Sequence, residues 1–219
     1  MSININYPYI TDYIRQNICP RVGILAEMEQ YAKLNNVPIS QPEAIRFIEV
    51  MCRIIRPERI LEIGTAIGYS SIAMAKAAGG VQIVTVEKSE EMFKIAKANI
   101  AAENLEGRIN VIYSDALDVL KNLDSKFDMI FMDAAKGQYM QFLPDVIRLL
   151  KSGGVLISDN VLYQGMVATD DLFVKRKCTI IKNLREYITE ISQSPLLDTS
   201  ILPLGDGVAI SYKLESDLE

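Results

Sequence analysis

Arg59-Ile-Leu-Glu-Ile-Gly-Thr-Ala-Ile-Gly-Tyr-Ser70 is the stretch that decides the fold. An apolar run of strand type stops at a glycine, and residues at helical spacing follow. The same change from strand to helix recurs along the chain. The expected strands span residues 59–64, 82–87, 109–113, 127–132 and 155–158, and the helices between them span 69–78, 90–103, 116–123 and 139–150. This alternation predicts an α/β fold, a doubly wound and Rossmann-like parallel sheet with helices on both faces.

The segment before this alternation is expected to be helical. Residues 7–36 contain apolar residues at helical spacing with a break at Pro20 and Gly23, which predicts two helices. Ser40, followed by Gln-Pro-Glu, resembles a helix cap. A third helix is therefore expected over residues 40–56.

The segment after the alternation should extend the sheet. A long helix is expected from just after Asp170 to about residue 193. Strands are expected over residues 199–204 and 208–214, with Gly205-Asp-Gly207 between them. An Asp-Gly pair between β-rich runs is a hairpin signal, so these last two strands should be antiparallel.

Composition favours one domain. A chain of 219 residues that is 49% hydrophobic can bury one sizeable core, so we expect a single domain over residues 1–219, with amino-terminal helices in 1–56 and the sheet core in 57–219. The net charge of −5 gives no long-range attraction to nucleic acid, which leaves only a local basic patch for such contacts. No secretory signal and no apolar run of roughly 20 residues is present, so a cytoplasmic protein without membrane contact is expected.

Two side-chain types narrow the chemistry. The three cysteines are odd in number and widely spaced, which favours reduced thiols over disulfides or a zinc knuckle. The chain has no histidine, so Ser-His-Asp and Cys-His catalysis, histidine bases and histidine-bound zinc are excluded. A metal ion must be held by oxygen atoms, which selects Mg²⁺, Mn²⁺ or Ca²⁺.

Acidic residues lie at or just beyond the ends of the five expected strands. They are Glu62, Glu87, Asp115, Asp133 and Asp159, the last of which is followed by Asn160. The ligand site of an open parallel sheet lies at the carboxyl ends of its strands. These side chains are therefore expected to meet in one crevice.

The first three strand ends suggest a nucleoside site. Gly64 lets the backbone approach a ligand and Ser70 lies at a helix start, although such turns also occur for purely structural reasons. The spacing departs from the dinucleotide-binding pattern. Glu87 lies where an acid binds both ribose hydroxyls, or else it is a solvated strand end. Ser114-Asp-Ala116 could meet an adenine amino group or cap the next helix.

The last two strand ends suggest a metal site. Asp133 and Asp159 should repel each other unless they share a cation or a proton, and Asn160 adds a neutral oxygen that suits a hard cation. Lys136 would lie nearby and could act as a base. A plain salt bridge from Lys136 to either carboxylate is the alternative.

Taken together, these motifs resemble the cation-dependent class I O-methyltransferases, the group of catechol and caffeoyl-CoA methyltransferases, over nearly the whole chain. The resemblance rests on Glu62-Ile-Gly-Thr-Ala-Ile-Gly-Tyr-Ser70, Glu87, Asp133-Ala-Ala-Lys136 and Asp159-Asn160. Three stretches are also similar to the bacterial tRNA 5-hydroxyuridine methyltransferases: Asp133-Ala-Ala-Lys-Gly-Gln-Tyr139, Asp159-Asn-Val-Leu-Tyr-Gln-Gly165 and Pro203-Leu-Gly-Asp-Gly-Val-Ala-Ile-Ser211.

The resemblance implies S-adenosylmethionine as methyl donor, Mg²⁺ as metal and a homodimer. The implied cofactor residues are Ser40, Glu62, Gly64, Gly68, Ser70, Glu87, Ser114, Asp115, Ala116 and Asp133. The implied metal ligands are Asp133, Asp159 and Asn160, and the implied catalytic residues are Lys136, Asp133 and Asp159. Ser40 departs from the family, because related chains often carry a methionine there. The chain also lacks the tryptophan that walls the substrate of the catechol enzymes.

Two acceptors remain open. A wobble hydroxyuridine in tRNA is favoured, because Lys175-Arg-Lys177, Lys182 and Arg185 could contact phosphates, although a solvated helix face would look the same. A small catechol-like or acyl-CoA phenol is the alternative. A noncatalytic nucleotide-binding regulator would require the residues of the metal site to be coincidental.

Overall fold

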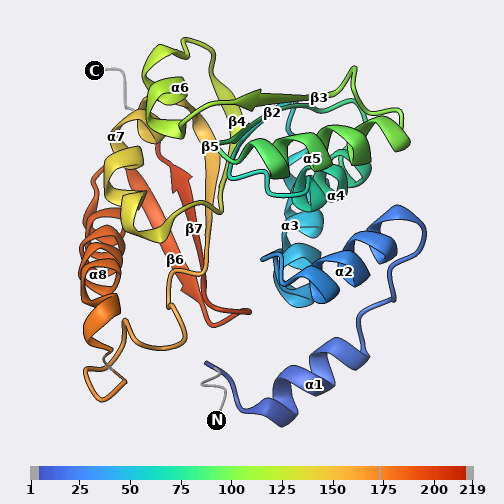
Figure 1. The fold of residues 1–219 in the computed structure, drawn as a ribbon. Coiled ribbons are helices and arrows are strands. Elements are labelled where there is room, and N and C mark those ends of the chain that lie inside the picture. The colour runs from blue at the N-terminus through green and yellow to red at the C-terminus, as the bar shows by residue number, and fades with distance from the viewer. Residues whose placement is uncertain (1–4, 173, 216–219) are drawn as a thin grey trace.

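A computed structural model describes residues 5–172 and 174–215. Its centre is a seven-stranded sheet with the order β3-β2-β1-β4-β5-β7-β6 (Figure 1). Strands β1 to β5 are parallel, whereas β7 is antiparallel to both β5 and β6. The strands are β1 Arg59–Ile63, β2 Gln82–Glu87, β3 Ile109–Tyr113, β4 Phe127–Met132, β5 Leu150–Asp159, β6 Leu197–Leu202 and β7 Val208–Lys213. The predicted α/β fold with a carboxy-terminal antiparallel hairpin is confirmed.

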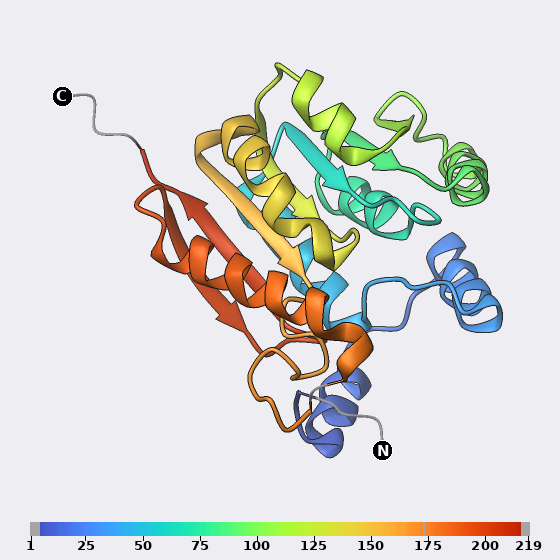
Figure 2. The ribbon, with the colours of Figure 1, turned by 60° about the vertical axis from the view of Figure 1, so that its left-hand side comes forward.

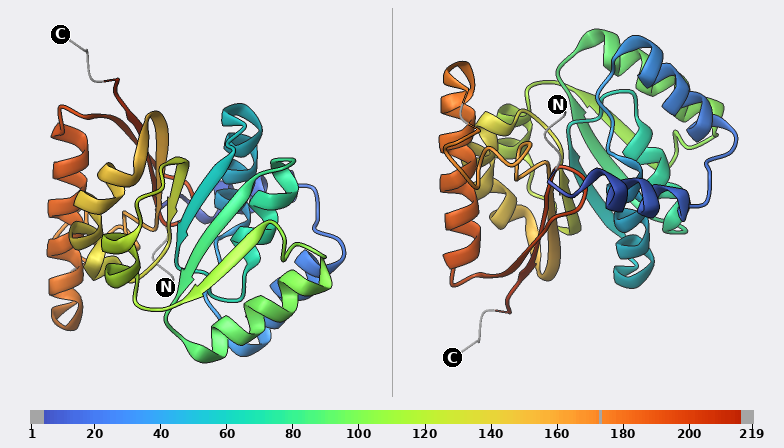
Figure 3. Two further views of the ribbon diagram at one scale, coloured as in Figure 1. Left: turned by 90° about the horizontal axis from the view of Figure 1, so that it is seen from above. Right: turned by 90° about the horizontal axis from the view of Figure 1, so that it is seen from below.

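Helices cover both faces of the sheet (Figures 2 and 3). They are α1 Pro8–Gln16, α2 Ile24–Asn35, α3 Pro42–Ile55, α4 Tyr69–Ala77, α5 Glu90–Ala102, α6 Ala116–Asn122, α7 Tyr139–Leu149 and α8 Cys178–Gln193, with 3₁₀ turns η1 Lys136–Gln138 and η2 Lys175–Lys177. Side chains alternate across a strand, so neighbours enter different cores. Ile60 packs in the cluster with α2 to α5, and Leu61 packs in the cluster with α6 to α8. None of the described helices is both long and apolar enough to cross a membrane.

Four elements differ from the prediction by two residues or more, and the first is β6, which spans Leu197–Leu202 rather than residues 199–204. Ser40 does not cap helix α3. The cap position is Gln41, which makes no side-chain capping bond, and the buried Ser40 hydroxyl makes no hydrogen bond. Strand β5 begins at Leu150, so residues 151–154, expected to form a turn, belong to the strand. Gly154 permits this because its missing side chain lets the backbone pass close to the Asp128 carbonyl of β4. The helix expected after Asp170 begins only at Cys178.

The residues next to Asp170, where the helix was expected to begin, make local side-chain contacts instead. The Asp171 amide donates to the Thr169 hydroxyl at 3.2 Å, and Asp170 pairs with Arg185 at 2.7 Å. Side chains of this kind favour turns over helix. The three cysteines are free thiols, as expected.

Candidate active site

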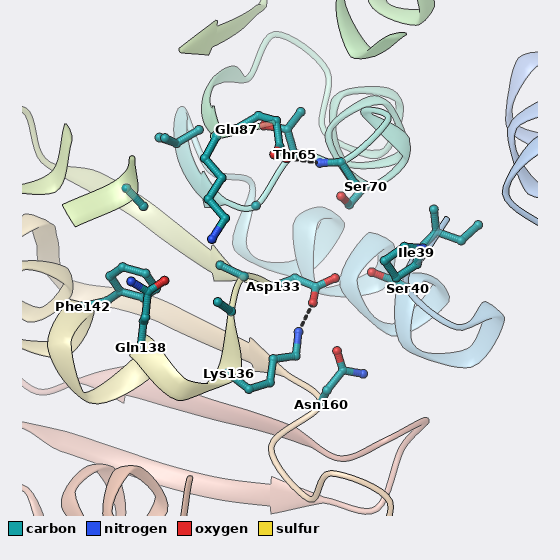
Figure 4. Close-up of a pocket in the computed structure, with 18 of the residues that line it drawn as sticks. Ile39, Ser40, Thr65, Ser70, Glu87, Asp133, Lys136, Gln138, Phe142 and Asn160 are labelled. Carbon is teal, nitrogen blue, oxygen red and sulfur yellow. Dashed lines mark hydrogen bonds and ion pairs between the residues drawn. The ribbon is translucent and has the colours of Figure 1, made fainter. Parts of the chain in front are cut away.

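The carboxyl edge of the parallel strands encloses a cavity of about 450 Å³ (Figure 4). Eight of the ten predicted cofactor residues line it: Ser40, Gly64, Ser70, Glu87, Ser114, Asp115, Ala116 and Asp133. Lys136 and Asn160 also line it. The cavity lies where the strand order reverses between β1 and β4, the usual ligand position in such sheets.

Gly64 is required by contact between two backbones. It has φ of +102°, and a Cβ atom there would lie 2.2 Å from the carbonyl oxygen of Asp133. Close approach of the β1 turn to the β4 end therefore explains this glycine without any ligand. The predicted role of Gly64 in approaching a ligand stays a prediction, although the residue lines the cavity.

Gly64→Ala is expected to destabilise the fold by about 2–4 kcal/mol, because backbone strain and overpacking each cost roughly 1–3 kcal/mol. The melting temperature should fall by about 5–15 °C. Gly79→Ala is the matched control, since φ there is ordinary and no atom lies within 4 Å of the added carbon. A Gly64→Ala protein that melts like the Gly79→Ala protein would contradict this account.

Glu62 and Gly68 do not line the cavity. The Glu62 carboxylate is fully buried and accepts hydrogen bonds from the Ser70 and Ser71 hydroxyls. Burial raises the pKa of Glu62 to about 7, although these hydroxyls lower it. Gly68 precedes α4 with φ of +87°, and its added Cβ would lie 3.5 Å from Ala96. Both residues shape the turn that presents Ser70.

Glu87 is fixed in orientation by two backbone amides. Its Oε2 accepts from the Ala66 amide at 2.8 Å and its Oε1 from the Ser89 amide at 2.7 Å. Each oxygen keeps a free lone pair for a ligand hydroxyl. Asp115 lines the cavity and also caps α6, because it accepts from the Leu117 amide at 2.9 Å. The capping alternative is confirmed, whereas the contact with an adenine amino group stays a prediction.

Asp133 and Lys136 form an ion pair at the other end of the cavity, and Asn160 lies beside them (Figure 4). Asp159 lies behind this wall with only 1% of its surface exposed, and it does not line the cavity. Its Oδ1 accepts from the Asn160 amide at 2.7 Å, whereas its buried Oδ2 has no partner. Burial, and then the charge of Asp133, raise the pKa of Asp159 to about 7.

The oxygen atoms at this end suit a hard cation. No cluster of three or more cysteine, aspartate or glutamate side chains that could hold a metal occurs among residues 5–172 and 174–215. The predicted set differs from such a cluster, because it combines two carboxylates with the Asn160 amide. The unpartnered Oδ2 of Asp159 is a buried oxygen that a bound ion would satisfy.

Sequence reasoning interpreted Asp206 only as part of a hairpin turn and missed it as a site residue. Asp206 lines the cavity. Val208 at the start of β7 pairs with Asp159 at the end of β5. Because β7 is antiparallel to β5, the residues just before β7, including Asp206, lie at the carboxyl edge of the parallel strands. The predicted hairpin would have placed Asp206 at the site if its antiparallel pairing with β5 had also been predicted.

A doubly wound sheet with a ligand cavity at its point of strand reversal defines the chain as a Rossmann-like α/β domain of the kind that binds nucleoside cofactors. Known proteins narrow this class. A family model described as O-methyltransferase matches residues 21–214. The chain therefore belongs to the O-methyltransferase family.

Individual relatives agree with this membership. The catechol O-methyltransferase of Mycobacterium tuberculosis is 31% identical over 153 residues, which cover 69% of each chain. A caffeoyl-CoA O-methyltransferase of Populus kitakamiensis is 28% identical over 198 residues, 86% of this chain and 83% of the relative. The structure of the O-methyltransferase from Bacillus cereus in complex with SAH has 28% identity and a TM-score of 0.82, covering 94% of this chain and 97% of that one. The family resemblance inferred from the motifs is confirmed, and the narrower likeness to tRNA enzymes stays a prediction.

Proposed function

We propose that this chain, as a homodimer, transfers a methyl group from S-adenosylmethionine to a hydroxyl oxygen with the aid of Mg²⁺. The favoured acceptor is 5-hydroxyuridine at the wobble position of tRNA, which becomes 5-methoxyuridine. The observation that carries the proposal is one cavity with two chemically different ends. Glu87 ends β2 and Asp115 follows β3, whereas Asp133 and Lys136 follow β4 and Asn160 follows β5 on the other side of the strand reversal.

The first end suits the cofactor. Gly64 and Ser70 would face its methionine part, Glu87 its ribose, and Ser114 to Ala116 its adenine. Bound there, S-adenosylmethionine supplies the methyl group on a sulfonium sulfur. The fixed Glu87 carboxylate supports this assignment, because two adjacent hydroxyls can bond to its two oxygens. The SAH in the Bacillus cereus relative, which is the demethylated cofactor, also supports it.

The second end suits proton removal from the acceptor. Asp133, Asp159 and Asn160 would hold Mg²⁺, which supplies Lewis acidity toward a hydroxyl. Lys136 Nζ lies against the Asp133 carboxylate, and we infer that this amine, once its ammonium form has released a proton to solvent, receives the proton that the acceptor hydroxyl loses. Asp133 holds the Lys136 amine in place at the cavity wall.

A basic rim, defined here as residues Lys175–Lys177 of η2, supports an RNA acceptor. Lys175 and Arg176 are exposed, and neither makes a salt bridge within the described part of the chain. Lys177 Nζ lies 4.9 Å from the ring centre of Tyr163, which lines the cavity. The rim therefore lies beside the acceptor end. Lys182 and Arg185, by contrast, face Glu186 and Asp170.

The Lys175→Ala/Arg176→Ala variant is expected to bind an anticodon stem-loop about tenfold more weakly, because each lost phosphate contact removes part of the counterion-release free energy. The slope of log affinity against log salt concentration should fall by about 2. Lys94→Ala/Lys97→Ala on α5 is the matched control with the same charge loss. Equal salt slopes for both variants and the unaltered protein would remove the rim from the RNA site.

A small phenol is the second candidate acceptor. Relatives named for small phenolic substrates favour it, and one of them is a catechol O-methyltransferase with 31% identity to this chain. A cavity of about 450 Å³ also lies within the range of small-molecule sites. For a phenol, the basic rim would be incidental.

A methyl-transfer assay separates these candidates. Labelled S-adenosylmethionine is offered with a 5-hydroxyuridine stem-loop or with catechol, in Mg²⁺ or in chelator, and sedimentation gives the mass of the enzyme. Transfer to the stem-loop only in Mg²⁺, together with loss of 5-methoxyuridine and retention of 5-hydroxyuridine in a deletion strain, is the expected result. Transfer to catechol alone would shift the proposal to the phenol. Cofactor binding without any transfer would favour a noncatalytic regulator.

A further inference from the structure

The loop between β6 and β7 brings a carboxylate to the cavity from the far side of Asp133. Asp206 lies in this loop, two residues before Val208, which pairs with Asp159. Apart from Ser40 and Asp133, the cavity residues assigned to the cofactor follow β1, β2 and β3. Asp206 lies beyond β5 in the sheet order, on the opposite side of the strand reversal. It therefore belongs to the acceptor end of the cavity.

The Asp206 loop is bound tightly to the loop that follows β5. The Val161 amide donates to the Gly207 carbonyl at 2.9 Å, and the Leu162 amide donates to the Asp206 carbonyl at 3.1 Å. Gly207 has φ of +89°, and a Cβ atom there would lie 2.5 Å from Leu162 Cγ. The Asp206 carboxylate is thus held by a fixed backbone.

The loop after β5 is itself strained. Asn160, Tyr163 and Gln164 have φ of 57°, 46° and 58°, a region that costs non-glycine residues free energy. The Gln164 amide donates to Oδ1 of the Asp206 carboxylate, so the same bond fixes both groups. Strain that is held in place by surrounding structure is typical of ligand sites.

One oxygen of the Asp206 carboxylate remains available. Among the described residues, no donor bonds to Oδ2, and the side chain is only half-buried at the cavity wall. Burial raises the pKa of Asp206, whereas the Gln164 amide and the charges of Lys136 and Lys177 lower it. A carboxylate that is fixed, partly desolvated and unpaired at one oxygen is a strong acceptor for a ligand hydrogen bond.

We propose that Asp206 is an acceptor-binding residue whose Oδ2 accepts a hydrogen bond from a ring N–H or O–H other than the hydroxyl that is methylated. This inference rests on the proposed function and adds a substrate requirement to it. The second hydroxyl of a catechol and the imide N–H of a 5-hydroxyuracil both supply such a donor. A ring without this second donor should be a poorer acceptor.

Asp206→Asn tests the contact, because the carboxamide oxygen can still accept from the Gln164 amide while the second position becomes a donor. The KM for the acceptor should rise about 10- to 100-fold, as expected for loss of a hydrogen bond to a charged group. Binding of S-adenosylhomocysteine and the melting temperature should stay unchanged. Asp198→Asn, an exposed carboxylate on β6, is the matched control and should leave KM unchanged.

Acceptor pairs identify the donor. Catechol is compared with phenol, and a 5-hydroxyuridine stem-loop is compared with its N3-methylated form. The Asp206→Asn effect should vanish for the member of the pair that lacks the second donor. An unchanged KM, or equal loss for both members of a pair, would overturn the role of Asp206 while leaving the methyl-transfer proposal intact. An unaltered enzyme that turns over none of these acceptors would overturn the proposed function and the assignment of Asp206 with it.

Discussion

Asp159→Asn is expected to lower kcat by about 10²–10⁴-fold, which corresponds to the several kcal/mol that a catalytic metal contributes. Asp159 is 1% exposed and its Oδ2 has no hydrogen-bond partner among the described residues, so this oxygen is available to bind a cation. Asparagine keeps the shape and the bond from the Asn160 amide but removes the charge. The remaining turnover should no longer respond to Mg²⁺ or to chelator.

Thermal melting separates lost catalysis from lost folding. Burial and the charge of Asp133 raise the pKa of Asp159, which means that the ionised carboxylate is costly in the folded chain. The metal-free Asp159→Asn protein should therefore melt at or above the temperature of the unaltered protein at pH 8. Mg²⁺ should raise the melting temperature of the unaltered protein and leave that of the variant unchanged.

Asp128→Asn is the matched control for Asp159→Asn. Asp128 is hydrogen-bonded to the Glu58 and Arg59 amides and paired with Lys151, near the starts of β1 and β4. This position is the opposite edge of the sheet from the cavity. The control should lose stability but keep Mg²⁺-dependent kcat. Turnover of Asp159→Asn in chelator at the rate of the unaltered enzyme would exclude a metal at this site.

The sheet could be predicted because its strands obey one simple rule. Parallel strands that are buried on both faces are mostly apolar along their length, so an acidic residue that closes such a run marks the carboxyl edge. Glu87 and Asp133 follow such runs, and both line the cavity. The position of these side chains thus follows from topology alone.

The exceptions arise where a side chain satisfies its neighbours. Glu62 lies within β1 opposite Thr85, two residues short of the level of Glu87, and it turns inward to Ser70 and Ser71. Both of those hydroxyls lie in the helix that follows, which a strand-end rule does not take into account. Ser40 was expected to cap a helix, but its hydroxyl is buried at the cavity wall. Such choices depend on three-dimensional packing rather than on local spacing.

Asp206 shows a different limit. Its turn signal was correct, since β6 and β7 do form a hairpin around it. Its importance depends on which strand the hairpin joins and in which direction, and long-range pairing of this kind leaves no local pattern. The same applies to Gly64, whose glycine is required by the Asp133 carbonyl 69 residues further on in sequence.

Lys136→Ala is expected to lower kcat by roughly 10²–10⁴-fold, the usual contribution of a general base, with a smaller effect on the KM of either substrate. The ion pair between Lys136 and Asp133 permits a simpler account in which Lys136 only holds Asp133 in place. Lys136→Arg separates the two accounts. Arginine can keep the ion pair but cannot accept a proton at any working pH.

The base account therefore predicts that Lys136→Arg is as slow as Lys136→Ala, and the structural account predicts that arginine restores most of the rate. Lys151→Ala is the matched control, because it removes another lysine–aspartate pair at the far edge of the sheet. It should leave kcat within about threefold of the unaltered enzyme, far from the 10²-fold or greater loss expected of a missing base. Single-turnover rates at saturating cofactor measure the difference at the chemical step, and a loss below about threefold in Lys136→Ala would make Lys136 a structural partner of Asp133.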